Sequence, residues 1–159
     1  MEICAGRHVV APNLWTGRAE VFDATVRTET PPAATLPPAV ARIDAALPER
    51  RELFGPFAPA DGRPAGDRTA WPTLLGQVAL ALQTLSRRPV TTLLHVAETS
   101  TAGFFRVVME AHDPVLAEAC LREAATILER AAAGDLGDLA ATVDRLTLLA
   151  DDVCVGPGT

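Results

Sequence analysis

Four short segments of the chain are rich in apolar residues, and the second of them alternates loosely between apolar and polar positions, which indicates four strands. Two of these segments, residues 2–10 and 19–27, lie near the start of the sequence. The other two, residues 91–98 and 104–111, are joined by the short polar segment 99–103, which ends in glycine. We therefore expect the second pair to form a β-hairpin.

Between the two pairs of strands, apolar residues recur at helical spacing. Thr35 is positioned to cap a first helix, and Pro48 is expected to end it. A second helix is expected over residues 72–87, because its apolar residues fall on one face: Leu74, Leu75, Val78, Leu82 and Leu85. The Pro/Gly-rich residues 53–68 separate the two helices and predict a long irregular loop.

Two further helices are expected after the hairpin. Asp113 followed by Pro114 is typical of a helix start, and Gly134 is typical of a helix end. Residues 138–150 predict the last helix. The order is therefore β-β-α-loop-α-β-β-α-α, which predicts one α+β domain over residues 1–159, with an antiparallel sheet of about four strands covered by helices.

Composition narrows the classes of function. The 159 residues carry a net charge of -6 and include 48% hydrophobic residues, which suits a globular protein and disfavours nucleic-acid binding. All 14 basic residues are Arg, so chemistry that needs a Schiff-base or P-loop lysine is excluded. With neither a long apolar run nor a signal-peptide pattern, we expect a cytoplasmic protein with reduced Cys4, Cys120 and Cys154.

Motifs for catalysis or metal binding are weak. The sequence has no Walker loop, no HExxH and no GxSxG. The best metal-like set is His95, Glu98, His112 and Asp113, but Asp113 already has a capping role, and His95 and Glu98 are expected on opposite faces of a strand. We therefore expect neither a catalytic set nor a metal or cofactor site.

Nucleophile and anion sites are also conceivable from the residue types. Cys4 with His8 would form a Cys–His pair, but both Cys4 and Cys120 lie in apolar patterns and are expected to be buried. The hydroxyls of residues 99–101 would suit an anion, or simply a polar hairpin loop.

Adjacent arginines are the clearest candidates for ligand binding. Arg50 and Arg51 form one pair, and Arg87 and Arg88 form another. A guanidinium group binds a carboxylate with two hydrogen bonds. Each pair also lies near the end of a predicted helix, where positive charge is favoured without any ligand. Both interpretations remain open.

Several stretches resemble the N-terminal domain of cyanophycin synthetases. Residues 11–15 (APNLW) are similar to the family's GPNYW-like turn, and residues 72–83 (PTLLGQVALALQ) to its GHVIEHVALELQ-like helix. Residues 97–111 resemble the family hairpin. Residues 156–159 (GPGT) resemble the GPST that precedes its ATP-grasp domain. The resemblance covers most of the chain in the same order.

The chain departs from the family at its polar positions. The family's H-x-x-E-H falls on Thr73, Gly76 and Gln77, and the arginine of its TRET segment falls on Ala97. Residues 61–68 stand where the family has its glycine-rich segment before the helix, and their sequence is different. The resemblance thus implies a retained scaffold with altered polar residues.

In this family the N-terminal domain is noncatalytic, holds the growing Asp–Arg polymer and contributes to assembly. The resemblance implies an accessory domain of an ATP-dependent amino-acid or peptide ligase, which binds a peptide-like substrate or docks to an ATP-grasp or Mur-like ligase, in the same chain or another. Residues of both signs on the predicted helix after Asp113 would suit such a ligand, or form an ordinary solvated face: Glu118, Arg122, Glu123, Glu129 and Arg130.

The expected substrate-binding residues are all arginines: Arg50, Arg51, Arg87, Arg88, Arg122 and Arg130. Two alternatives remain open. One is a homo-oligomerising scaffold that assembles through its apolar helices without a small ligand. The other is an independent small enzyme.

Overall fold

The computed structural model describes residues 1–11, 19–29, 31–57, 68–86 and 88–154. The side chains of Ala11, Ala19, Ala33 and Cys154 lie outside this description. All structural statements below concern the described part of the chain.

The four predicted strands form one antiparallel sheet in the order β1-β2-β4-β3. Their bounds are Glu2–Ala11 for β1, Ala19–Arg27 for β2, Leu93–Glu98 for β3 and Phe104–Glu110 for β4. The two hairpin-like pairs meet through β2 and β4, which are the central strands. The predicted α+β class and antiparallel sheet are therefore confirmed, and β1 and β3 are the sheet edges.

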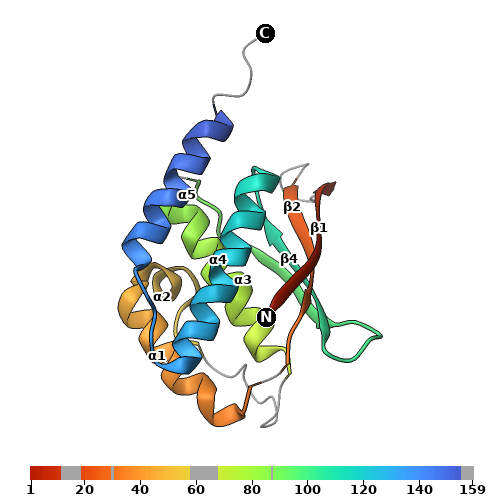
Figure 1. Ribbon diagram of the computed structural model, residues 1–159. Coiled ribbons are helices and arrows are strands. Elements are labelled where there is room, and N and C mark those ends of the chain that lie inside the picture. The colour runs from red at the N-terminus through yellow and green to blue at the C-terminus, as the bar shows by residue number, and fades with distance from the viewer. Residues whose placement is uncertain (12–18, 30, 58–67, 87, 155–159) are drawn as a thin grey trace.

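Five α-helices and one short 3₁₀ turn accompany the sheet. Their bounds are Ala33–Thr35 for the 3₁₀ turn, Leu36–Ala46 for α1, Pro48–Phe54 for α2, Ala70–Leu85 for α3, Pro114–Ala133 for α4 and Leu139–Cys154 for α5. The helices lie on one side of the sheet (Figure 1). Helix α3 packs on β3 and β4, α4 packs on β1 and β2, and α1, α2 and α5 pack against this inner pair.

The core lies between the sheet and the inner pair of helices. Alternate residues of the central strands turn inward, so that Phe22, Ala24 and Val26 face the helices beside Val107 and Met109. Helix α3 is buried on nearly every side, as its continuous apolar sequence predicts.

Two glycines allow a neighbouring core side chain to pack directly against the backbone. A Cβ at Gly76 of α3 would lie 2.5 Å from Leu93 Cδ1 of β3, so the missing side chain lets helix and strand approach. A Cβ at Gly6 of β1 would lie 2.3 Å from Cζ of the Phe22 ring. Both positions show why a larger residue would displace a core side chain.

Helix α4 has the ends that the sequence predicts. The Asp113 carboxylate accepts a hydrogen bond from Leu116 N at 2.8 Å, and Gly134 ends the helix with φ +96°. Arg42 of α1 donates to the Ala131 carbonyl at 3.0 Å, which places a cation at the C-terminal end of α4. These contacts fix the helix that carries the charged surface discussed below.

The region around Pro48 corrects two expectations. Pro48 follows the end of α1 as predicted, but it also begins α2, because proline is well tolerated in a first helical turn. The irregular loop predicted from residue 53 therefore starts later, and residues 58–67 of it lie outside the described residues.

Thr35 occupies the N-cap position of α1, but its side chain makes no capping hydrogen bond.

Candidate functional site

Arg50 is an internal residue of the fold. Its side chain is 0% exposed, and its Nε donates to Asp44 Oδ1 at 2.5 Å. Nη1 donates to Gln77 Oε1 at 2.8 Å, Nη2 donates to the Gly55 carbonyl at 3.3 Å, and the guanidinium lies 5.8 Å from the centre of the Phe57 ring. Each of the three guanidinium nitrogens therefore has an acceptor within the protein, so the structure gives the buried Arg50 a packing role where the sequence suggested substrate binding.

Gln77 and Gly76 of α3 are two positions at which the sequence departs from the polar residues that the resemblance to cyanophycin synthetases implies. Gln77 falls where that family has a histidine, and here its amide oxygen holds a buried cation. Gly76 falls on the family's glutamate position and is packed against Leu93. Gln77 thus provides a polar acceptor for the buried Arg50, whereas Gly76 allows α3 to pack closely on β3.

The other members of the two arginine pairs lie on different elements. Arg51 is exposed on α2. Arg88 is half-buried after α3, and its backbone N–H donates to the Gln83 carbonyl at 3.1 Å. Arg87 lies outside the described residues.

Arg122 and Arg130 are both exposed on α4. Arg122 is oriented by Glu118, one helical turn earlier, whose Oε1 accepts from Nε at 3.1 Å and from Nη2 at 2.7 Å. Arg130 lies beside the turn at Gly137, where an added Cβ would meet its guanidinium. In the described structure no partner contacts Nη1 of Arg122, which leaves that nitrogen available to a ligand.

A hollow of about 260 Å³ opens beside Arg122, between the start of β1 and the middle of α4. Seven residues line it: Met1, Glu2, Ile3, Arg122, Ala125, Thr126 and Glu129. Its charged groups have both signs. The Met1 amino group forms an ion pair with Glu129, while Arg122 borders the same hollow. Of the six predicted arginines, Arg122 lines this hollow.

The uncovered face of the sheet carries an ion cluster that the sequence analysis did not identify. Asp23 of β2 is 8% exposed and lies between two arginines of the neighbouring strands. Arg106 donates to its two carboxylate oxygens at 2.8 Å each, and Arg7 donates to Oδ2 at 2.8 and 3.1 Å. Hydrogen bonds from Arg106 and Arg7 hold the pKa of Asp23 below its usual value of 3.8, although burial acts in the opposite direction.

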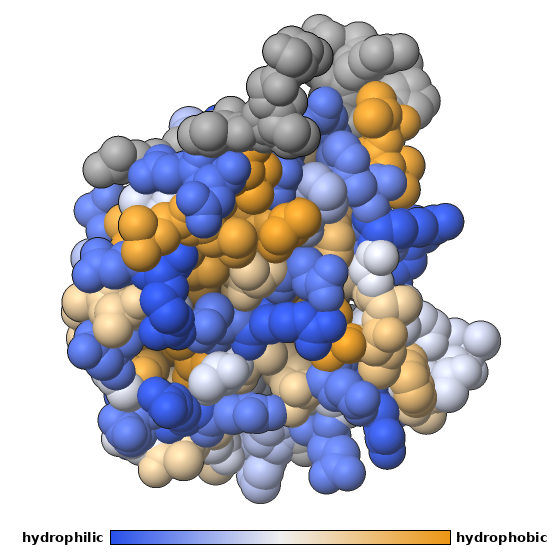
Figure 2. Space-filling model, turned by 45° about the horizontal axis from the view of Figure 1, so that its top comes forward, coloured by the Kyte–Doolittle hydropathy of each residue, from blue (hydrophilic) through white to orange (hydrophobic). Residues whose placement is uncertain are grey.

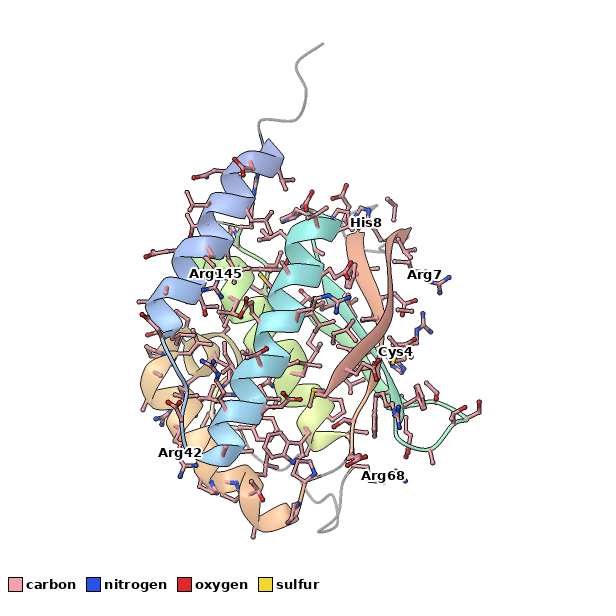
Figure 3. All side chains as sticks on the ribbon, viewed as in Figure 1. Cys4, Arg7, His8, Arg42, Arg68 and Arg145 are labelled. Carbon is pink, nitrogen blue, oxygen red and sulfur yellow. The ribbon has the colours of Figure 1, made fainter. Side chains whose placement is uncertain are left out.

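The alternation in β2 was the available signal for this cluster. Because Phe22 and Ala24 face the core, Asp23 has to face the other side. The pairing of Asp23 with Arg7 on β1 is set by the register of the sheet, and single-strand patterns do not reveal that register. Arg7 points away from the helices in Figure 3.

The cysteines differ in burial, and one expectation about them is wrong. Cys120 is buried in α4 as predicted, and burial, reinforced by the charge of Glu123, raises the pKa of its thiol. Cys4 was expected to be buried but is exposed. It lies at a register shift between Ile3 and Ala5 of edge strand β1, where the regular alternation of sides breaks.

The weak metal-like set does not form a site among the described residues, where no group of three or more His, Cys, Asp or Glu side chains converges. Asp113 caps α4, as expected. Glu98 is bound to Arg68 at 3.1 Å, and it accepts from Gly103 N at 2.9 Å in the hairpin. The Thr99 hydroxyl, which was considered for an anion site, donates to the Thr101 carbonyl at 3.2 Å. This hydroxyl is therefore engaged within the hairpin loop.

Apolar side chains on the surface are scattered. The large exposed ones are Val10, Leu94, Val115 and Leu148. In Figure 2 the hydrophobic areas of one face are divided by hydrophilic side chains. No described helix is long and apolar enough to cross a membrane.

No protein-family model matches this chain, and no curated protein matches it significantly.

Proposed function

We propose that this protein is a noncatalytic accessory domain of a cytoplasmic, ATP-dependent amino-acid or peptide ligase system, and that it binds a peptide-like substrate on the surface between β1 and α4. The observation that carries the proposal is the hollow of about 260 Å³ that Arg122 and Glu129 border. A peptide presents carboxylate and cationic groups together, so a site for it needs both signs of charge within reach.

The geometry of α4 supports this use of the hollow. Arg122 and Glu129 are seven residues apart, which is about 10 Å along a helix. Three residues of an extended peptide span about the same distance. Because Glu118 already orients the Arg122 guanidinium, binding a carboxylate at Nη1 requires little further ordering of that side chain.

The resemblance to cyanophycin-synthetase N-terminal domains supplies the ligase context of the proposal. It is carried by residues 11–15, 72–83, 97–111 and 156–159. The altered positions Thr73, Gly76 and Gln77 suggest a substrate other than cyanophycin. A ligase in the same chain or in another would supply the ATP-dependent step, and this domain would hold the substrate or dock to that enzyme.

Calorimetric titration with three short capped peptides tests the binding proposal. The peptides carry aspartate, arginine or both. We expect the mixed peptide to bind the wild-type protein most tightly and Arg122→Gln to weaken it roughly tenfold, since a charge-assisted hydrogen bond is lost. Arg51→Gln is the matched control, because Arg51 is an exposed arginine on α2. Equal affinity of the wild-type and Arg122→Gln proteins would contradict the proposed site.

The ligase context has its own test. A tagged full-length chain, expressed in its own host and isolated with its partners, is expected to bring down an ATP-grasp or Mur-like ligase that is identified by mass spectrometry. Recovery of a self-assembled chain alone would favour the oligomeric scaffold. Turnover of ATP with amino acids by the purified chain would instead support an independent enzyme.

A further inference from the structure

Edge strand β1 presents backbone groups that the described fold leaves without partners. The Glu20 carbonyl accepts from Ala111 N at 2.9 Å, and Thr28 N donates to the Gly103 carbonyl at 3.0 Å, so the even-numbered residues of β2 bond towards β4. In an antiparallel sheet the direction alternates at each residue. The odd-numbered residues of β2 therefore bond towards β1.

The register then identifies the outward residues of β1. Ala5, Arg7 and Val9 pair with Thr25, Asp23 and Val21, and these are the positions that exchange hydrogen bonds with β2. The residues between and after them turn their N–H and C=O groups to the free edge: Gly6, His8 and Val10. Among the described residues outside β2, the backbone of β1 has one hydrogen-bond partner, the Cys4 thiol on the Glu2 carbonyl.

The free edge lies between two oriented arginines. Arg7 stands on the uncovered face of the sheet with its side chain 71% exposed, and Arg122 stands on the helix side, 58% exposed. Asp23 holds Nε and Nη2 of Arg7, and Glu118 holds the same two nitrogens of Arg122. In both residues Nη1 has no partner in the described structure.

Carboxylates near this edge are already engaged. Glu129 is paired with the Met1 amino group, Glu118 is paired with Arg122, and Glu2 lies 3.9 Å from Arg27. Each side of the edge therefore offers the outer nitrogen of an arginine to a carboxylate. A side chain opposite Arg7 in an added strand would lie about 5 Å away, within reach of that guanidinium.

We propose that β1 accepts an extended, carboxylate-bearing peptide as a fifth strand, with its backbone paired to Gly6, His8 and Val10 and its acidic side chains bound by Arg7 and Arg122. The proposal rests on the proposed peptide-binding function and specifies how the peptide lies. Strand addition of this kind takes affinity from main-chain hydrogen bonds and selectivity from alternate side chains. A peptide that continues from Gly6 towards the start of β1 would reach the hollow that Ile3 and Arg122 line.

The sharpest variant is His8→Pro, with His8→Ala as its matched control. Proline at residue 8 removes an outward N–H and leaves the hydrogen bonds of Arg7 and Val9 to β2, and proline is tolerated in edge strands at such positions. The probe is a fluorescent, capped peptide in which pairs of adjacent aspartates alternate with pairs of threonines, so that carboxylates lie on both faces of the added strand, and its binding is followed by anisotropy. We expect His8→Pro to weaken its binding at least tenfold and His8→Ala to change it less than about threefold.

Two N-methylated forms of the same probe give a second measurement that does not depend on folding of the proline variant. Each form is methylated on one of the two alternate sets of backbone nitrogens. An added strand uses the nitrogens of one edge only, so we expect one form to lose binding and the other to keep it.

The outcomes separate strand addition from the proposed function. If the probe binds and Arg122→Gln weakens it, but His8→Pro and both methylated forms bind as tightly as their controls, the peptide site stands and strand addition is wrong. If only the mixed aspartate–arginine peptide binds the wild-type protein, the peptide site stands and strand addition of a carboxylate-bearing peptide is wrong. If neither it nor the acidic probe binds, both proposals are overturned. A wild-type dimer that His8→Pro converts to a monomer, measured by sedimentation, would show that a second copy occupies the edge and would also overturn the proposal.

Discussion

Arg50 and Arg122 are two arginines of the same predicted class that the fold places in opposite environments. Arg50 is enclosed between α2 and α3, and each of its guanidinium nitrogens has a protein acceptor. Arg122 lies on α4 at the border of an open hollow, and a single carboxylate orients it. One side chain joins elements of the core, and the other offers a nitrogen to a ligand.

The difference shows that the residue type and a helical sequence context do not by themselves fix the role of an arginine. Burial of a cation is costly unless its polar atoms have partners, and Asp44, Gln77 and the Gly55 carbonyl each accept from one nitrogen of Arg50. An exposed ion pair such as that of Arg122 with Glu118 contributes little to stability. Substitutions at the two positions should therefore affect different measurements.

Arg50→Ala is expected to have the largest effect. It leaves the Asp44 carboxylate and the Gln77 amide without their buried partner, which costs about 3 kcal/mol or more of unfolding free energy. For a chain of this length we expect Tm to fall by roughly 10 °C, measured by differential scanning calorimetry. Arg51→Ala, the exposed neighbour, is the control and should change stability by less than about 0.5 kcal/mol. Equal effects of the two substitutions would contradict the structural role of Arg50.

Asp23→Asn is expected to have a smaller, pH-dependent effect. The folded pKa of Asp23 is lowered, chiefly by its hydrogen bonds with Arg106, so its stabilising effect is present above the unfolded pKa and is lost as pH falls through the folded pKa. Denaturant unfolding from pH 7 downward should show the wild type more stable at neutral pH, with the difference shrinking below about pH 4. Glu52→Gln, an exposed carboxylate on α2, should show no comparable trend. A constant difference at all pH values would contradict this assignment.

Arg122→Gln is expected to have the smallest effect on stability. The ion pair with Glu118 is solvent-exposed on both sides, so the unfolding free energy should change by less than about 0.5 kcal/mol. Denaturant unfolding of Arg122→Gln, measured alongside its peptide titration, tests whether the substitution weakens binding without lowering stability. A loss of stability comparable to that of Arg50→Ala would mean that Arg122 has a structural role, and any loss of binding would then have a structural cause.

Local patterns predicted most of the secondary structure for identifiable reasons. The ends of α4 can be predicted from the sequence, because the capping residues Asp113, Pro114 and Gly134 each act within one helical turn. The prediction at Pro48 was incomplete because proline both ends one helix and begins another. Cys4 was misplaced because the prediction rested on the mainly apolar composition of its segment, whereas the residue lies exposed at a register shift of edge strand β1.

The candidate site was less predictable than the fold. Arg122 was named from the mixed charges of its helix, but its neighbours in the hollow come from the start of β1, more than a hundred residues away in sequence. Arg7 and Asp23 were not singled out, since the register of the sheet decides which charged residues of two strands meet.

The sequence by itself determined the class of fold, the order of the main elements and the ends of α4, because periodicity, capping and turn residues act over a few neighbouring positions. Only the tertiary structure decided that Arg50 is internal, that Asp23 lies between Arg7 and Arg106, and that one edge of β1 stands beside α4. The physical reason is that these relations depend on strand register and helix packing. Both are set by contacts between segments far apart in the chain, and neither leaves a local pattern.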